Sequence, residues 1–181
     1  MKTLLISIAL MATMLTHAQD KKQVTTTIFK ASITCENCKA KIMKQLPYEK
    51  GVKNVEVDVD SKLITVSYKS IKNTDEKMNE AIKELGFESE IKGHPMTFIV
   101  SGNCNMCKQR IEEALLDIEG VNMAAWNAET KEVQVLVSSS VLTIDKLQEV
   151  VAKAGHDTNG AKAGDEIYAS LPDCCKYIRN K

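Results

Sequence analysis

The sequence predicts an α+β protein built from two tandem βαββαβ units, with a leader segment before them and a short C-terminal extension after them. Each unit alternates stretches of period-two hydrophobicity with stretches of helical periodicity, in the same order. That order, β-α-β-β-α-β, is the ferredoxin-like plan. The chain also matches itself without gaps at an offset of 69 residues. The matched pairs include Cys35 with Cys104, Cys38 with Cys107, and Gly86 with Gly155.

The first unit, residues 24–92, begins with residues 25–33, which alternate polar and apolar side chains and predict a strand. A helix is predicted over residues 37–48, where Ile42 and Leu46 share one face. Two further alternating stretches predict a strand pair joined by a tight turn at Asp60-Ser61. These strands cover residues 52–60 and 62–69.

The first unit ends with a second helix and a short strand. Asn73-Thr74-Asp75 is a typical helix cap, and Gly86 is a typical helix end. Residues 87–91 follow as the fourth strand. The second unit, residues 96–161, repeats this plan after a junction near Gly93-His94-Pro95. Its predicted strands are 96–101, 121–128, 131–137 and, weakly, 157–161, and its helices are 106–117 and 144–154.

The bulk composition limits the possible functions. The chain has 24 basic and 24 acidic residues and only 4% aromatic residues. A neutral chain with few aromatic side chains lacks the charge and stacking surfaces that nucleic-acid binding requires. The sequence has no glycine-rich phosphate loop and no convincing serine, histidine and acid set. We therefore expect neither a nucleic-acid partner nor an enzyme.

The first 18 residues have the three parts of a secretory signal peptide. Lys2 precedes an apolar stretch from Leu4 to Leu15, and the segment ends in a small-x-small pattern at Thr16-His17-Ala18. This stretch has 12 residues, whereas a membrane-spanning helix needs about 20, so we expect cleavage after Ala18. An uncleaved anchor is the alternative. The mature protein is predicted to be periplasmic or secreted, without stable membrane insertion.

Each unit carries two cysteines at the turn from its first strand into its first helix, as CENC at residues 35–38 and CNMC at residues 104–107. The free N–H groups and partial positive charge of a helix N-terminus favour the thiolate, which binds metals and attacks disulfides. The spacing lets both sulfurs converge on one ion, and two thiolates suit Cu(I). Zinc usually takes four ligands, so one pair is an incomplete zinc site.

The chain resembles the heavy-metal-associated domain family over residues 24–161. That family includes small copper chaperones, the metal-binding domains of copper-transporting ATPases and the periplasmic mercury-binding protein. The first unit resembles it in ITCENCKAKI, GVKNVEVDVDSKLITVSY and LGF, and the second in GNCNMCKQRIEEAL, GVNMAAWNAETKEVQV and AGHDT. The resemblance implies two metal sites, formed by Cys35 with Cys38 and by Cys104 with Cys107.

Two positions depart from the family's pattern. The family commonly has Met two positions before the first cysteine, and this chain has Ile33 and Gly102 there. We expect Ile33 to be a mild change and Gly102 to leave the second loop freer. After the second helix, Phe87 matches the aromatic residue of many members, whereas the second unit has His156. Some members resemble this one in using a histidine there as an extra ligand. An ordinary turn residue is the alternative.

The C-terminal tail, residues 164–181, is predicted to form a short helix from Asp165 to Leu171 and then present Cys174 and Cys175. Adjacent cysteines can chelate an ion, form a strained vicinal disulfide or cross-link chains. One hypothesis is that the tail folds back and adds both cysteines to the second site, giving a richer set of metal ligands. That set is Cys104, Cys107, His156, Cys174 and Cys175. A structural or intermolecular disulfide is the alternative.

Three other residues carry weaker signals. His94, beside Pro95 in the junction, is expected to be solvated. Met106, between the second pair of cysteines, is expected to cap the core or face solvent, with a soft ligand as the alternative. Trp126 is at an inward-facing strand position and is expected in the core.

The sequence therefore predicts an exported, non-enzymatic protein that binds a soft metal ion, most favourably Cu(I), and transfers it by thiolate exchange. Hg(II) and Zn(II) are the alternative ions, and a metal-transporting membrane protein is the expected donor or acceptor. A periplasmic thiol–disulfide oxidoreductase is the alternative function, although the spacers EN and NM differ from those of thioredoxin-like enzymes. A third hypothesis, structural disulfides in an interaction module, is weaker because C-x-x-C closes only a tiny loop.

Overall fold

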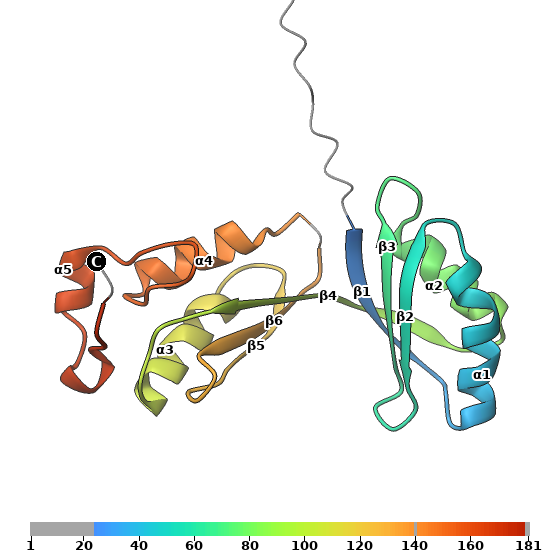
Figure 1. Ribbon diagram of the computed structural model, residues 1–181, viewed down its shortest axis with the longest axis horizontal. Coiled ribbons are helices and arrows are strands. Elements are labelled where there is room, and N and C mark those ends of the chain that lie inside the picture. Colours follow the sequence, from blue (N-terminus) through green and yellow to red (C-terminus); the bar gives the residue numbers. More distant parts are fainter. Residues whose placement is uncertain (1–23, 140, 180–181) are drawn as a thin grey trace, which may run out of the picture.

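The computed structural model describes residues 24–139 and 141–179, which contain a six-stranded antiparallel sheet of order β2-β3-β1-β4-β6-β5 (Figure 1). The predicted signal peptide, residues 1–18, lies outside the described residues. The first half of the chain forms β1 (Val24–Ala31), α1 (Glu36–Gln45), the 3-10 turn η1 (Leu46–Tyr48), β2 (Val52–Asp58), β3 (Leu63–Lys69) and α2 (Asp75–Glu84). The second half forms β4 (Ser89–Ile99), α3 (Asn105–Leu116), β5 (Val121–Trp126), β6 (Glu132–Val137), α4 (Ile144–Lys153), α5 (Asp165–Ala169) and the 3-10 turn η2 (Asp173–Cys175).

Strand β4 belongs to both units. Its residues 89–93 pair with β1 and its residues 94–99 pair with β6. The predicted junction between two separate strands is therefore wrong, because one strand runs through it (Figure 1). Gly93 allows the change of partner: its φ is +127°, and a Cβ there would lie 2.3 Å from the carbonyl oxygen of Val137. Pro95 follows where β1 no longer pairs, and a free edge tolerates its missing N–H.

The other elements confirm the predicted repeat, with one reduction in the second unit. Both units run through strand, helix, two hairpin strands and helix in the same order. The fourth strand of the second unit, predicted weakly at residues 157–161, is reduced to a single bridge between Val100 and Thr158. The chain leaves the sheet there and continues into the tail.

Residues 69 positions apart perform the same local tasks. Thr74 and Thr143 each accept a hydrogen bond from the backbone N–H three residues later, which caps α2 and α4. Lys62 and Lys131 have φ values of 59° and 62° in the two strand hairpins. The repeat in the sequence is therefore a repeat of caps and turns as well as of hydrophobic pattern.

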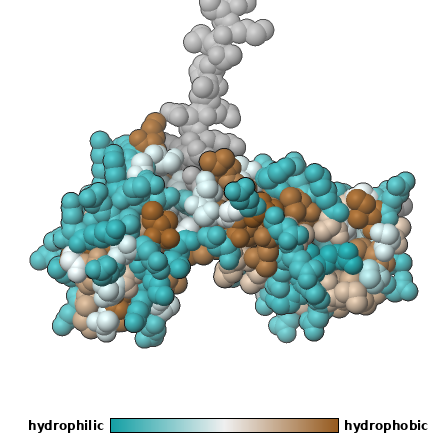
Figure 2. All heavy atoms as spheres, turned by 180° about the vertical axis from the view of Figure 1, so that it is seen from behind, coloured by the Kyte–Doolittle hydropathy of each residue, from teal (hydrophilic) through white to brown (hydrophobic). Residues whose placement is uncertain are grey.

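Each unit buries a core between its own helices and its own part of the sheet. Helices α1 and α2 cover the first part, and α3 and α4 cover the second (Figure 1). The face in Figure 2 is mostly polar, with apolar residues gathered near its middle. None of the helices in residues 24–139 and 141–179 is long and apolar enough to cross a membrane. The largest fully buried side chains include Phe29, Ile42 and Ile64 in the first unit and Trp126, Ile111 and Leu147 in the second.

His94 is buried rather than solvated, which corrects the sequence expectation. It is 4% exposed, its Nε2 lies 3.0 Å from Oδ2 of Asp75, and its Nδ1 lies 3.2 Å from Oγ1 of Thr27. Thr27 and Tyr68 also donate hydrogen bonds to Asp75. Burial acts to raise the pKa of Asp75, but the hydrogen bonds from His94, Thr27 and Tyr68 outweigh it and lower that pKa to about 2. Asp75 in turn raises the pKa of His94. This polar cluster ties α2 to β1, β3 and β4.

Candidate metal centre

The first cysteine loop is open to solvent. Cys35 is the N-cap residue of α1, its side chain is exposed, and its Sγ lies 2.8 Å from Sγ of Cys38. A hydrogen bond from the Cys35 thiol, and then one from the backbone of Thr34, lower the pKa of Cys38. Beneath the loop, Ile33 is fully buried in the core, as expected for a mild replacement of the family's Met. This arrangement favours the thiolate form of Cys38 at the start of α1.

An aromatic ring belongs to the core cluster against which Cys38 packs. Phe87 is 9% exposed, and Nζ of Lys41 lies 5.7 Å from the centre of its ring. Lys41 comes from α1 and Phe87 from the turn after α2, so this contact joins the two helices of the first unit. A cation at this distance contributes about 0.5–1 kcal/mol at exposed positions.

The second loop is tightly packed, which corrects the expectation that Gly102 leaves it free. Gly102 is buried, and a Cβ on it would lie 3.0 Å from Cβ of Cys107 and 3.1 Å from the Trp126 ring. The indole fills the space where a side chain would otherwise lie. Nζ of Lys131 also donates a hydrogen bond to the Gly102 carbonyl at 2.7 Å. The core position predicted for Trp126 is confirmed, at 2% exposed.

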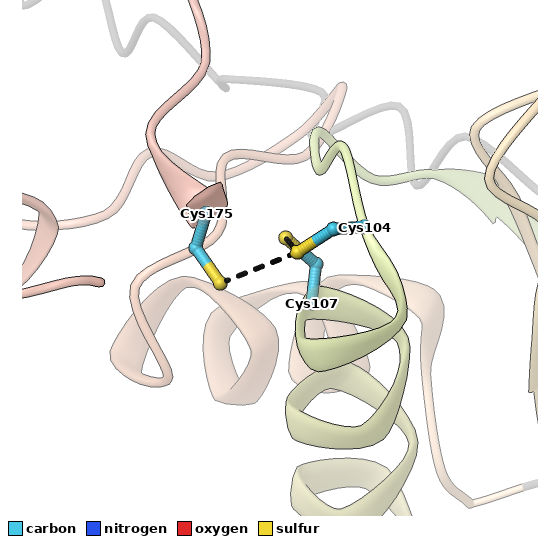
Figure 3. A group of neighbouring side chains, drawn as sticks. All are labelled: Cys104, Cys107 and Cys175. Atoms are coloured by element: carbon cyan, nitrogen blue, oxygen red, sulfur yellow. Dashed lines mark hydrogen bonds between the residues drawn. The ribbon is translucent and has the colours of Figure 1, made fainter. Parts of the chain in front are cut away.

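Three sulfurs meet at the second loop. Sγ of Cys104 lies 3.5 Å from Sγ of Cys107 and 3.8 Å from Sγ of Cys175. The three sulfurs all lie within 4.8 Å of one another, and they form the group with metal-binding spacing found among the described residues. Figure 3 shows Cys175 reaching from the tail toward Cys104, while Cys107 lies in the first turn of α3. Segments 68 residues apart thus meet at one point.

The three thiols differ in acidity. The backbone N–H of Cys107, followed by the Cys107 thiol, lowers the pKa of Cys104 to about 7, although burial opposes this. Burial and the neighbouring Cys107 and Cys104 sulfurs raise the pKa of Cys175. The cluster therefore has one thiol that ionises near neutral pH, beside a thiol that keeps its proton until a metal or a base removes it.

The other predicted ligands lie at different places around this cluster. His156 is fully buried, its Nδ1 lies 2.9 Å from the Ser101 carbonyl oxygen, and burial lowers its pKa. Its Nε2 is buried without a hydrogen-bond partner among the described residues, and the ring is not part of the three-sulfur group. Cys174 is exposed, and the Cys104 sulfur raises its pKa. Met106 is 48% exposed, so it faces solvent and does not cap the core.

The two cysteine loops lie at opposite ends of β4. The first loop meets the start of this strand, where the Ser32 N–H donates to the Glu88 carbonyl at 2.9 Å. The second loop follows Ile99, the last residue of β4. At about 3.3 Å per residue, a strand of 11 residues is roughly 36 Å long. One ion therefore cannot bridge the two loops, and each loop is a separate site.

The domain model for "heavy-metal-associated domain" matches residues 27–88 and 97–157, one match for each unit. The chain belongs to the heavy-metal-associated domain family. It is 29% identical over 127 residues to the copper-exporting P-type ATPase of Bacillus subtilis, a match that covers 70% of this chain and 16% of the ATPase. It is 26% identical over 141 residues to the copper-exporting P-type ATPase of Staphylococcus saprophyticus, covering 78% of this chain and 18% of the ATPase. The chain thus spans less than a fifth of these relatives.

Two solved structures are also similar to this heavy-metal-associated protein. One is the solution structure of the N-terminal soluble domains of Bacillus subtilis CopA, at 27% identity, with 76% of this chain and 93% of that chain covered and a TM-score of 0.37. The other is the CopZ metallochaperone, at 29% identity, with 35% of this chain and 97% of that chain covered and a TM-score of 0.34.

Sequence reasoning missed the residues that hold the tail of this heavy-metal-associated protein in place. Arg179 forms a two-point ion pair with Asp157, with Nε 2.8 Å from Oδ2 and Nη2 2.9 Å from Oδ1. Asn103, directly before the second pair of cysteines, donates a hydrogen bond to the Lys176 carbonyl at 3.1 Å. One sequence signal for these residues was available. The repeat ends near residue 161, and the first unit is followed by no segment equivalent to the tail, since the chain there passes directly into the second unit.

Proposed function

We propose that this protein is an exported carrier of a soft metal ion, preferentially Cu(I), which it binds at two C-x-x-C loops and passes on by thiolate exchange. The observation that carries the proposal is the first loop, where two thiols lie together at an exposed helix N-terminus and one has a lowered pKa. Thiolates are the ligands that Cu(I) prefers, and two suffice for it. Membership in the heavy-metal-associated domain family supports the same chemistry.

Transfer follows from the incompleteness of the first site. Two thiolates hold a soft ion while leaving it accessible, so a third thiolate from another protein binds before either of the first two leaves. Each step exchanges one metal–sulfur bond for another, without any change in oxidation state. Neither step needs an acid, a base or a bound substrate, so the proposal is for a carrier and not for an enzyme.

The proposed partner is a metal-transporting membrane protein, and the proposed location is the periplasm or the medium outside the cell. Two copper-exporting P-type ATPases among the relatives support copper as the cargo. The signal-like pattern of residues 1–18 supports export. Hg(II) and Zn(II) are the competing cargoes, and they differ in coordination, since zinc normally takes four ligands in a closed site.

A titration of the reduced protein with Cu(I), in competition with a coloured chelator, tests the proposal. The wild type should take about two ions, and Cys35→Ser/Cys38→Ser and Cys104→Ser/Cys107→Ser should each take about one, because the loops are separate sites. Met106→Leu is the matched control, since this exposed sulfur lies between the second pair and should leave the stoichiometry unchanged. Failure of the wild type to compete for Cu(I) would contradict the proposal, and catalysis of disulfide exchange would favour the oxidoreductase instead.

A further inference from the structure

The three sulfurs at the second loop have the spacing of a three-coordinate thiolate site. Metal–sulfur bonds of about 2.3 Å in a planar trigonal arrangement place the sulfurs about 4 Å apart. The distances from Cys104 to Cys107 and Cys175 are 3.5 and 3.8 Å. The three side chains therefore need little movement to enclose one soft ion (Figure 3).

Burial distinguishes this group from the first loop. Cys107 and Cys175 are both 0% exposed, and Cys104 is half-buried, whereas Cys35 is exposed. An ion held by the three sulfurs would be shielded on the side where a partner's thiolate approaches an open C-x-x-C loop. Cys175 takes the place of that incoming thiolate with a ligand from the same chain.

Hydrogen bonds and an ion pair hold the tail beside the second loop. The Arg179 guanidinium makes its two-point contact with Asp157, and Nη2 also donates to the Ala163 carbonyl at 2.7 Å. The Tyr177 hydroxyl accepts a hydrogen bond from the Asp157 N–H at 2.6 Å, and its ring stacks on His156 with 6.1 Å between ring centres. Bidentate pairs of this kind fix geometry as well as adding stability.

An apolar contact holds the part of the tail that precedes Cys175. Leu171 is 4% exposed and packs against Gly155. A Cβ added to Gly155 would lie 2.8 Å from Cδ2 of Leu171. Asn103 of the cysteine loop also bonds to the Lys176 carbonyl, so the residues on both sides of Cys175 are held. The packing of the tail therefore holds Cys175 beside the second loop.

We propose that the tail converts the second loop into a three-thiolate site that retains its ion, while the first loop remains a two-thiolate site that exchanges its ion. This inference rests on the proposed function. When the ion binds, the Cys175 thiol releases its proton to solvent and its sulfur forms the third metal–sulfur bond, with no electron transfer. Release from the second site then requires the tail to lift, which breaks the contact between Arg179 and Asp157.

Counting sulfur neighbours by X-ray absorption on Cu(I)-loaded protein tests this directly. The Cys35→Ser/Cys38→Ser variant confines the ion to the second loop, and the Cys104→Ser/Cys107→Ser variant confines it to the first. We expect three sulfur neighbours in the former and two from the protein in the latter. Two sulfur neighbours at the second loop would overturn the inference while leaving the proposed function standing, whereas failure of both variants to bind Cu(I) would overturn the proposed function.

Substitutions in the tail identify the third ligand. In the Cys35→Ser/Cys38→Ser background, Cys175→Ser should lower the count to two and weaken Cu(I) binding by at least about tenfold. Cys174→Ser, at the exposed neighbouring position, is the matched control and should keep three sulfurs. Loss of the third sulfur in Cys174→Ser, with no change in Cys175→Ser, would overturn the assignment to Cys175. If Cys175→Ser disturbs the packing of the tail, the number of sulfur neighbours of Cu(I) in Cys35→Ser/Cys38→Ser, whose tail is unsubstituted, still decides between two and three ligands.

Discussion

The two cysteine loops have the same backbone plan and opposite packing. In the first unit, Ile33 lies buried beneath a pair of cysteines of which Cys35 is exposed and Cys38 half-buried, and the matching strand residue is Val57. In the second unit these positions are Gly102 and Trp126, and the indole fills the space that the glycine leaves. The larger side chain of the two positions is thus on the loop in the first unit, as Ile33, and on the strand in the second, as Trp126. A repeat can therefore keep the volume of its core while the side chains that surround its sulfurs change.

The units also differ where they contact the shared strand. The first unit has Thr27, Tyr68 and Asp75 around His94, with a half-buried carboxylate among them. The residues 69 positions later are Met96, Val137 and Ile144, which carry no charge. The stability of the first unit should therefore respond to pH through this cluster, while the matching region of the second unit should not.

Replacing Trp126 by the first unit's residue should break the second unit most strongly. Trp126→Val removes most of a buried ring and the hydrogen bond from its Nε1 to the Val100 carbonyl, so we expect a loss of about 3 kcal/mol in the free energy of unfolding. Denaturation in urea measures it. Met123→Ala, at an exposed position of the same strand, is the control and should change stability by less than about 0.5 kcal/mol. Equal effects of the two substitutions would contradict the packing account.

Placing the first unit's loop residue in the second loop tests the exchange of volume directly. Gly102→Ile should destabilise by about 2 kcal/mol, because its side chain meets Trp126 and Cys107 in a filled space. Adding Trp126→Val to this variant should recover part of the loss, which a double-mutant cycle in urea would report as a favourable coupling. Purely additive losses would show that the two positions do not exchange volume.

The polar cluster predicts a pH window for the first unit. The raised pKa of His94 gives stability that is present below its ordinary value of 6.5 and is lost as pH rises through the folded value. The pKa of Asp75, lowered to about 2, gives stability that is present above 3.8 and is lost as pH falls toward 2. Asp75→Asn should destabilise by about 2 kcal/mol at pH 6 and flatten both slopes. Thermal melting from pH 2 to 9 measures this, and unchanged slopes would contradict it.

At the N-terminal caps of α2 and α4 the two units should behave alike. Thr74→Ala and Thr143→Ala each remove one hydrogen bond at a helix N-terminus, and each should destabilise by about 1 kcal/mol. Measured side by side in urea, the two losses should agree. A cap that matters in one unit alone would show that the repeat is not maintained at this level.

The element order could be predicted from the sequence because local signals agree with the repeat. Period-two strands, the cap at Thr74 and the helix end at Gly86 are each readable from a few residues, and Gly86 has the expected positive φ of 87°. The shared strand was not predictable in this way. Gly93 and Pro95 carry the local signal of a turn, and only the pairing of β1 and β6 with one strand overrides it.

The candidate site divides in the same way. Both cysteine pairs and their helix starts were found from spacing and the repeat, since these are local. The contribution of Cys175 was only a hypothesis, because it depends on where the tail folds. The position of the tail is set by the contact of Arg179 with Asp157 and by the packing of Leu171 against Gly155. The periodic patterns of the sequence do not indicate that these segments lie together. The buried His94 was misread for the same reason, since its partner Asp75 lies 19 residues away on another element.

The first loop is expected to exchange its ion and the second loop to retain it. The most direct measurement is the rate at which a thiol-competing chelator removes Cu(I) from Cys104→Ser/Cys107→Ser, which keeps the first site, and from Cys35→Ser/Cys38→Ser, which keeps the second. Removal from the first site should be at least about tenfold faster, because its ion is held by two thiolates, one of them exposed, without a third. Equal rates, or faster removal from the second site, would contradict the account.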